Sequence, residues 1–272
     1  MKRIITKIIA LVGATLLWGC EFLSYLPFPD HTKTYGLYSF IYYYVDFPEE
    51  WDTGYNADKQ MLKFAIPKND KINPYLHWDD LTVVSNILGT QEEKAKHYEL
   101  SVANNDTEYN LKVSEDILMG TGWNWPTYIR PVAYWRHYTS FEITSDVDYD
   151  EEHPAGTSLN DLTTFSFRTF KNFIDAGYPK DNDSVVFDPM NASTEVMIPV
   201  NELKPDDNRI MAVCANFDYP PDNERYSYDW GLTFAKLPTI TSKHKLSIKM
   251  TTNDNVTYTQ LVDVDFGVQN EE

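Results

Sequence analysis

The strongest constraint on the fold is an alternation of apolar and polar residues near the C-terminus. It runs through residues 244–251 and again through residues 256–266, and Asn253, Asp254 and Asn255 separate the two runs. Because successive side chains of a strand point to opposite faces of a sheet, each run predicts a strand with one buried face. The polar turn between them predicts an antiparallel hairpin.

Shorter runs elsewhere predict that most of the chain is built from strands. Residues 35–47 read YGLYSFIYYYVDF, and large residues on both faces are typical of a strand in the middle of a sheet. Aromatic residues make up 15% of the chain, which also favours strands over helices. Further strands are predicted at residues 61–66 and 81–87, and a second hairpin at residues 98–102 and 109–113, with its turn at residues 104–107.

Only one short helix is predicted, at residues 91–96, where Thr90 and Glu93 have the spacing of a capping box. The many short strands, separated by turns rich in Asn, Asp and Pro, predict an antiparallel β-sandwich of immunoglobulin-like class. A fresh strand begins at Phe141 after an irregular stretch, so we place a boundary near residue 140. One large sandwich and two small sandwich units both remain open.

The first twenty residues have the pattern of a secretory signal. Lys2, Arg3 and Lys7 form a basic start, and residues 8–18 carry no charge. A membrane-spanning helix needs about 20 apolar residues, so this segment is too short to be a permanent span.

The end of the signal, residues 17–20 (LWGC), resembles the lipobox of bacterial lipoproteins, with Leu17 three positions before Cys20 and the small Gly19 directly before it. The resemblance implies that the Cys20 thiol receives a diacylglycerol, that residues 1–19 are removed, and that the new amine is acylated with a chain such as palmitate. Three acyl chains attach a protein permanently to a membrane. We therefore expect a lipidated tether over residues 20–32 and a place in the outer membrane, on its periplasmic face or at the cell surface. The alternative is an ordinary signal peptide in which Cys20 is incidental.

Residues 139–161, TSFEITSDVDYDEEHPAGTSLND, resemble a segment of immunoglobulin-like lipoproteins of Gram-negative gut commensals. In that family a strand ending in Thr-Ser is followed by an acidic turn, then by His-Pro-Ala-Gly and Ser-Leu-Asn-Asp. The resemblance implies an immunoglobulin-like sandwich over residues 141–272, behind a β-rich region over residues 33–140. The family has no assigned activity, so it implies no functional residue.

The charge of the chain bears on its partners. Asp and Glu number 41 against 23 Lys and Arg, which gives a net charge of −18. Such a chain repels phosphates, so we expect no nucleic-acid partner. Once Cys20 is lipidated only Cys214 remains, and its apolar surroundings at residues 210–215 predict a buried thiol. The sequence has no zinc, phosphate-loop or serine-hydrolase motif.

An aromatic segment at residues 122–138 contains the first set of candidate binding residues. Flat rings stack on sugar faces, and arginines donate hydrogen bonds to sugar hydroxyls or carboxylates. The segment therefore predicts a surface for a glycan or an envelope protein, with burial of the rings in the core as the alternative. The candidate residues are Trp123, Trp125, Tyr128, Arg130, Trp135 and Arg136.

An acidic run contains the second set. Asp146, Asp148 and Asp150 stand two residues apart and Glu152 follows. Alternating carboxylates can converge on a hard cation, so the run predicts a calcium site, with a solvated acidic turn as the alternative. We expect no other cofactor.

These observations favour a membrane-anchored, non-catalytic binding or structural module, with a glycan as a candidate ligand. Two alternatives stay open: a subunit of a cell-envelope complex, and a hydrolase of envelope polymers or polysaccharides. We expect no enzyme activity, because no catalytic motif supports the hydrolase.

Overall fold

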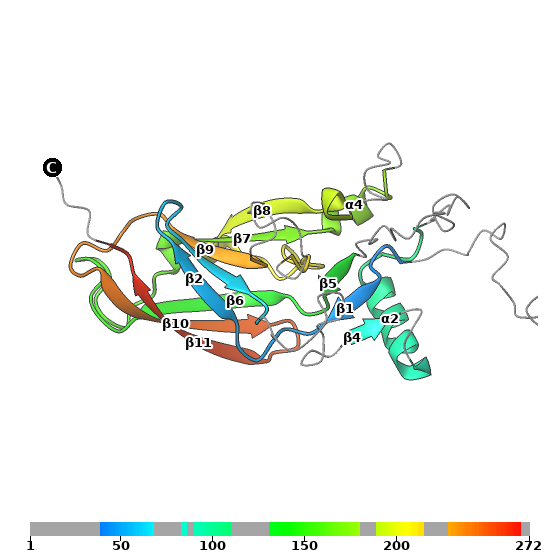
Figure 1. Ribbon diagram of the computed structural model, residues 1–272, viewed down its shortest axis with the longest axis horizontal. Coiled ribbons are helices and arrows are strands. Elements are labelled where there is room, and N and C mark those ends of the chain that lie inside the picture. Colours follow the sequence, from blue (N-terminus) through cyan, green and yellow to red (C-terminus); the bar gives the residue numbers. More distant parts are fainter. Residues whose placement is uncertain are drawn as a thin grey trace, which may run out of the picture. The chain divides into compact units, whose positions relative to one another are not determined.

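The computed structural model describes residues 39–67, 83–85, 90–109, 131–179, 189–214 and 228–267. All of them belong to one compact unit, which comprises residues 39–109 and 127–272. Regular structure in these residues is mainly β, as predicted, and Figure 1 shows the arrangement of the strands. No helix within the described ranges is both long and apolar enough to cross a membrane.

The larger sheet has five antiparallel strands. Its order is β2–β3–β9–β7–β8. The strands are β2 (Asp52–Asn56), β3 (Met61–Ala65), β9 (Trp230–Phe234), β7 (Thr163–Thr169) and β8 (Thr194–Pro199). The prediction of a strand at residues 61–66 is confirmed by β3.

The second sheet has three antiparallel strands. They are β6 (Tyr138–Ser145), β10 (Lys243–Thr252) and β11 (Thr257–Asp265), with β10 in the middle. β10 and β11 form the predicted C-terminal hairpin and pair without interruption from Lys243↔Asp265 to Thr251↔Thr257. Asn255 in the turn has a φ of 63°, a conformation that asparagine tolerates better than most residues.

The two sheets pack face to face around one aromatic core, with β6, β10 and β11 below β7, β8 and β9 in Figure 1. Trp230 of β9 stacks on Phe64 of β3, with ring centroids 3.7 Å apart. The same indole lies 5.5 Å from Tyr138 and 6.0 Å from Phe141, both of β6, in the opposite sheet. Stacked layers with a shared core make this body a β-sandwich.

Strands from both sides of residue 140, the expected boundary, belong to the same sheets. β6 itself spans residues 138–145, and β3 pairs with β9 in the five-stranded sheet. The sandwich is therefore a single body to which both halves of the chain contribute.

A third, small sheet lies beside the sandwich core. It is formed by β1 (Tyr43–Val45), which pairs antiparallel with β4 (Val83–Ser85) and parallel with β5 (Val132–Tyr134). A second apolar cluster includes Ile41 and Tyr44 near this sheet and Phe170 before the short helix α4 (Lys171–Asp175). β1 covers part of the strand predicted at residues 35–47, and β4 lies within the strand predicted at residues 81–87, of which only residues 83–85 are among the described residues. Three 3-10 turns complete the described elements: η1 (Asn160–Leu162), η2 (Pro189–Ala192) and η3 (Val200–Glu202).

The predicted helix is longer than expected, and it replaces half of a predicted hairpin. Helix α2 spans Gln91–Ala103, and its capping box of Thr90 and Glu93 is confirmed. The prediction of a strand at residues 98–102 was therefore wrong, and residues 110–113 of its partner lie outside the described residues. Tyr98 and Val102 are one helical turn apart and are 67% and 49% exposed. Three alternating apolar residues are too few to distinguish a period of 2 from a period of 3.6.

Candidate functional site

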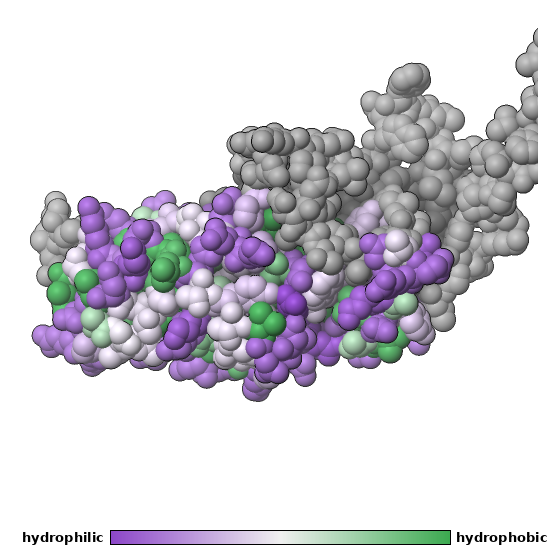
Figure 2. All heavy atoms as spheres, turned by 90° about the horizontal axis from the view of Figure 1, so that it is seen from below, coloured by the Kyte–Doolittle hydropathy of each residue, from purple (hydrophilic) through white to green (hydrophobic). Residues whose placement is uncertain are grey.

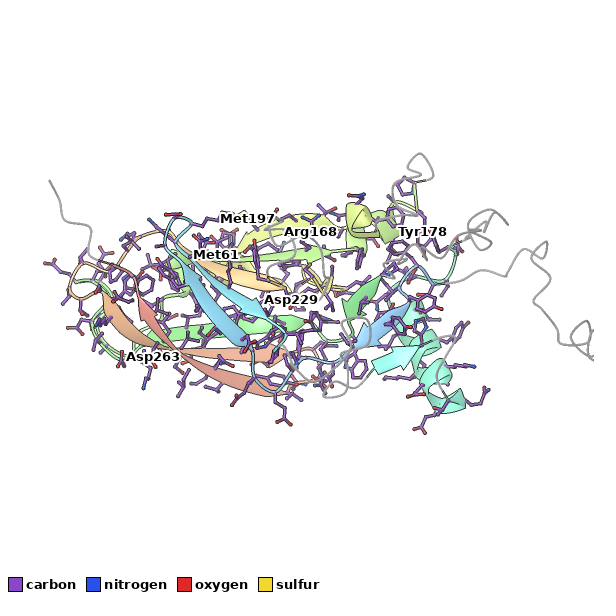
Figure 3. The ribbon with its side chains drawn as sticks, in the orientation of Figure 1. Met61, Arg168, Tyr178, Met197, Asp229 and Asp263 are labelled. Atoms are coloured by element: carbon purple, nitrogen blue, oxygen red, sulfur yellow. The ribbon has the colours of Figure 1, made fainter. Side chains whose placement is uncertain are left out.

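A pocket of about 240 Å³ opens on the outer face of the five-stranded sheet. Outward-facing side chains of β7 and β8 and the residues just before β9 form its walls. Figure 3 labels two of its residues, Arg168 and Asp229. The described residues that line it are Lys59, Ser166, Phe167, Arg168, Glu195, Tyr228 and Asp229.

Beside the pocket, a glycine occupies the central strand of the sheet. Gly231 of β9 pairs with Lys63 on one side and Ser166 on the other. A Cβ at Gly231 would lie 3.1 Å from two atoms of the Met61 side chain and 3.2 Å from the carbonyl oxygen of Leu62. Met61 therefore covers Gly231, and a larger residue at this position would displace the Met61 side chain. The Ser166 hydroxyl donates a 3.3 Å hydrogen bond to the Gly231 carbonyl.

Arg168 is the most firmly oriented side chain in the pocket. Its Nε donates to the Ser193 hydroxyl at 2.8 Å and its Nη2 to the Ser193 carbonyl at 2.7 Å. Its Nη1 lies 3.8 Å from Oε2 of Glu195, which is an ion pair but too long for a hydrogen bond. The guanidinium therefore has a fixed orientation, with one nitrogen facing a carboxylate across a gap.

Asp229 forms the inner wall and joins distant segments. Its two oxygens accept hydrogen bonds from the backbone N–H groups of Cys214, at 2.7 Å, and Ile66, at 3.0 Å. Cys214 is buried, as predicted. Next to Asp229, the Lys63 ammonium lies 5.0 Å from the centre of the Tyr228 ring, within range of a cation–π interaction.

The aromatic segment of the sequence is described only in part, since Trp123, Trp125, Tyr128 and Arg130 lie outside the described residues. Trp135 is half-buried and packs against the second apolar cluster. Arg136 forms ion pairs with Asp46 at 2.8 Å and Asp254 at 3.0 Å, and it also donates to the Tyr258 hydroxyl.

Arg136 therefore has a structural role where we predicted a ligand-binding one. It joins the segment after β1 to the turn of the C-terminal hairpin. Burial raises the pKa of Asp46, and the positive charge of Arg136 opposes that rise. The guanidinium thus stabilises a partly desolvated carboxylate.

The acidic run forms a folded turn whose carboxylates bind backbone amides. Asp146 accepts from the Lys245 N–H at 2.8 Å, and Asp148 accepts from the Ala155 N–H at 2.7 Å. Asp150 accepts from the Glu152 N–H at 2.9 Å.

The Glu152 carboxylate pairs with Lys236 at 3.8 Å, and Asp150 lies 4.0 Å from the same ammonium. Within the described ranges no three or more His, Cys, Asp or Glu side chains are arranged to hold a metal ion. Asp146, Asp148, Asp150 and Glu152 are therefore not assembled as the predicted calcium site, and their carboxylates instead bind backbone amides and Lys236.

His153 links this turn to η1. Its Nδ1 lies 2.7 Å from Asp150 and its Nε2 lies 3.2 Å from Asp161. Burial disfavours the charged imidazole, but the hydrogen bonds to both carboxylates outweigh burial and raise the pKa of His153. The two hydrogen bonds of His153 therefore hold the two ends of the loop together, and they favour its charged form.

A second buried histidine pairs with a serine. The Ser145 hydroxyl lies 2.7 Å from Nδ1 of His244, whose Nε2 donates to the Thr241 carbonyl at 2.7 Å. A serine beside a histidine is the beginning of a hydrolase nucleophile. Here both side chains are buried, and Ser145 also accepts from the Val147 N–H, so the pair supports the fold.

A buried carboxylate that the sequence did not single out holds the first described residues. Asp106 is fully buried and accepts hydrogen bonds from the N–H groups of Phe40, at 2.7 Å, and Ile41, at 2.9 Å. It also accepts from the hydroxyls of Ser39 and Tyr178. We name these contacts the Asp106 clamp.

A histidine of α2 supports the same segment. His97 Nε2 donates to the Ile41 carbonyl at 3.1 Å, and the Ser101 hydroxyl lies 3.4 Å from Nδ1 of the same ring. Ile41 is thus bound through both its amide and its carbonyl group.

Comparison with known proteins found no relative of this chain. No protein-family model matches the chain, and neither a curated protein nor a solved structure does. Functional inference therefore rests on the residues described above and on the pattern of the first twenty.

Proposed function

We propose that this chain is a lipid-anchored protein of the outer membrane whose β-sandwich is a non-catalytic binding or structural module. The observation that carries the proposal is the run Leu17-Trp18-Gly19-Cys20 directly behind a basic, then apolar, signal. Lipid on Cys20 would leave the folded body outside the bilayer, joined to it by the tether.

The surroundings of the buried histidines support a non-catalytic role. His153 is hydrogen-bonded to Asp150 and Asp161, His244 is hydrogen-bonded to Ser145, and both histidines are buried. A general acid or base must instead reach a substrate. The outer-face pocket remains as the place where the module would bind a small polar group.

The alternative role in a cell-envelope complex would be favoured by a large exposed apolar patch. On the face that Figure 2 shows, hydrophobic residues lie in separate small spots among hydrophilic ones. This face therefore gives that alternative no support.

Metabolic labelling with a palmitate analogue tests the anchor. We expect label on the wild-type protein and on Cys214→Ala, which removes the buried thiol, and no label on Cys20→Ala. The Cys20→Ala protein should also retain its signal and run as a longer chain. Normal processing and membrane attachment of Cys20→Ala would contradict the proposal.

A further inference from the structure

We propose that the outer-face pocket binds one sugar residue of a neutral glycan, through hydroxyl groups placed between Arg168 and Glu195. The proposal deepens the binding role suggested above and rests on it. It begins from the ion pair at the pocket, which is held open at 3.8 Å.

The width of this gap suits a bridging hydroxyl. A direct hydrogen bond between Nη1 and a carboxylate oxygen would need about 2.7–2.9 Å. An oxygen placed between them can accept from Nη1 and donate to Oε2 at ordinary hydrogen-bond lengths. Arg168 is prevented from closing the gap because Ser193 holds its Nε and Nη2.

The charges of the lining favour a neutral ligand. Lys59 and Arg168 are balanced by Glu195 and Asp229 among the residues that line the pocket. A carboxylate or phosphate that approached Arg168 would meet Glu195 within about 4 Å, and like charges at that distance repel. A cation would meet the guanidinium. A hydroxyl both donates and accepts, so it satisfies both partners.

The dimensions of the pocket limit the ligand to a small unit. A volume of about 240 Å³ is below the roughly 300–1,000 Å³ of pockets for drug-sized ligands. One sugar residue, with the rest of its chain outside, fits this limit better than a longer segment.

The test uses residues 21–272 and immobilised neutral oligosaccharides, namely cellotriose, xylotriose, mannotriose and chitotriose. Trigalacturonic acid and triglycine serve as the anionic and zwitterionic probes. We expect the wild-type protein to bind at least one neutral probe. Glu195→Gln, which keeps the shape but removes the charge of the acceptor, should bind that probe about tenfold more weakly, because hydrogen bonds to charged groups are the stronger ones. Arg168→Lys should weaken it similarly.

The matched control is Asp263→Asn on the outer face of the other sheet, where Lys245 and Asp263 form an ion pair of the same 3.8 Å separation. This variant should bind like the wild type. Neutral-probe binding that is unchanged in both pocket variants would overturn the pocket assignment and leave glycan binding intact. Preference for trigalacturonic acid or triglycine would overturn the neutral class. Binding of no probe would overturn the sugar proposal, while lipid labelling of Cys20 would still stand on its own result.

Discussion

Replacing Asp106 by alanine should release residues 39–41, which the Asp106 clamp binds. The carboxylate accepts four hydrogen bonds, two from hydroxyls and two from backbone amides. The hydroxyls have other acceptors nearby, since Ser39 also lies 2.9 Å from the Ile41 carbonyl and Tyr178 3.3 Å from the Asn105 carbonyl. The amides of Phe40 and Ile41 would be left buried with no acceptor.

The expected cost follows from those two amides. Each buried N–H group without a partner costs about 1–3 kcal/mol, so two cost about 4 kcal/mol. Removing the carboxylate also removes the cost of its desolvation, which offsets part of this loss of stability. Burial raises the pKa of Asp106 and so disfavours its charged form. We expect Asp106→Ala to lower the free energy of unfolding by about 3 kcal/mol. Asp106→Asn should lower it by about 2 kcal/mol, because its oxygen can serve one amide while its NH₂ group faces the other.

Urea unfolding and amide hydrogen exchange together test this reasoning. Urea unfolding reports the global free energy of unfolding, whereas amide exchange at Phe40 and Ile41 reports local release of these residues. Asp263→Ala is the control, because that side chain is 85% exposed and its loss should change neither measurement. The clamp would be refuted if Asp106→Ala matched this control, or if the two amides exchanged at their wild-type rates.

Three further predictions follow from other contacts. The pKa of His153 is raised in the folded protein, so the stability that His153 contributes is complete below pH 6.5 and is lost as pH rises through the folded pKa. The pKa of Asp150 is lowered, so the stability that Asp150 contributes is present above pH 3.8 and is lost as pH falls through the folded pKa of Asp150. Between pH 6 and pH 8.5 the melting temperature should therefore fall more in the wild type than in His153→Asn, and equal slopes would exclude this role. Arg136→Met should lower the free energy of unfolding, measured with urea, by about 2 kcal/mol, a value between those of exposed and buried ion pairs. A change near zero would show that the pairing of Arg136 with Asp254 is incidental. Thr90→Ala should destabilise the start of α2 by about 1 kcal/mol, which faster amide exchange in the first turn of the helix would show. Thr90→Ser keeps a capping hydroxyl and should exchange like the wild type.

The accuracy of the sequence reasoning depended on the length of each pattern. The C-terminal hairpin was predicted correctly because the alternation continues through two long runs with a polar turn between them. At residues 98–102 the alternation covers three apolar positions, which helix α2 also accommodates. The capping box fixed the start of α2, but no comparable signal marked its end, so the helix was predicted too short.

The candidate pocket could not be predicted from the sequence, because its residues come from separate strands. Arg168 and Glu195 meet only because β7 and β8 pair in the register Arg168↔Glu195. Each is an ordinary charged residue in its own segment. The sequence did identify Arg136 as unusual, but the charges that surround it are supplied by residues far away in the chain.

Several of the acidic residues have structural roles in the described part of the chain. From its 41 acidic residues and their spacing, the sequence argued against a nucleic-acid partner and suggested a bound cation. In the described part of the chain, Asp106, Asp150 and Asp229 instead accept hydrogen bonds from backbone amides of segments that would otherwise be open loops or strand ends. A carboxylate can accept several such bonds at once, which a neutral side chain of the same size cannot. Part of the negative charge therefore holds together the irregular segments that a sandwich of short strands requires.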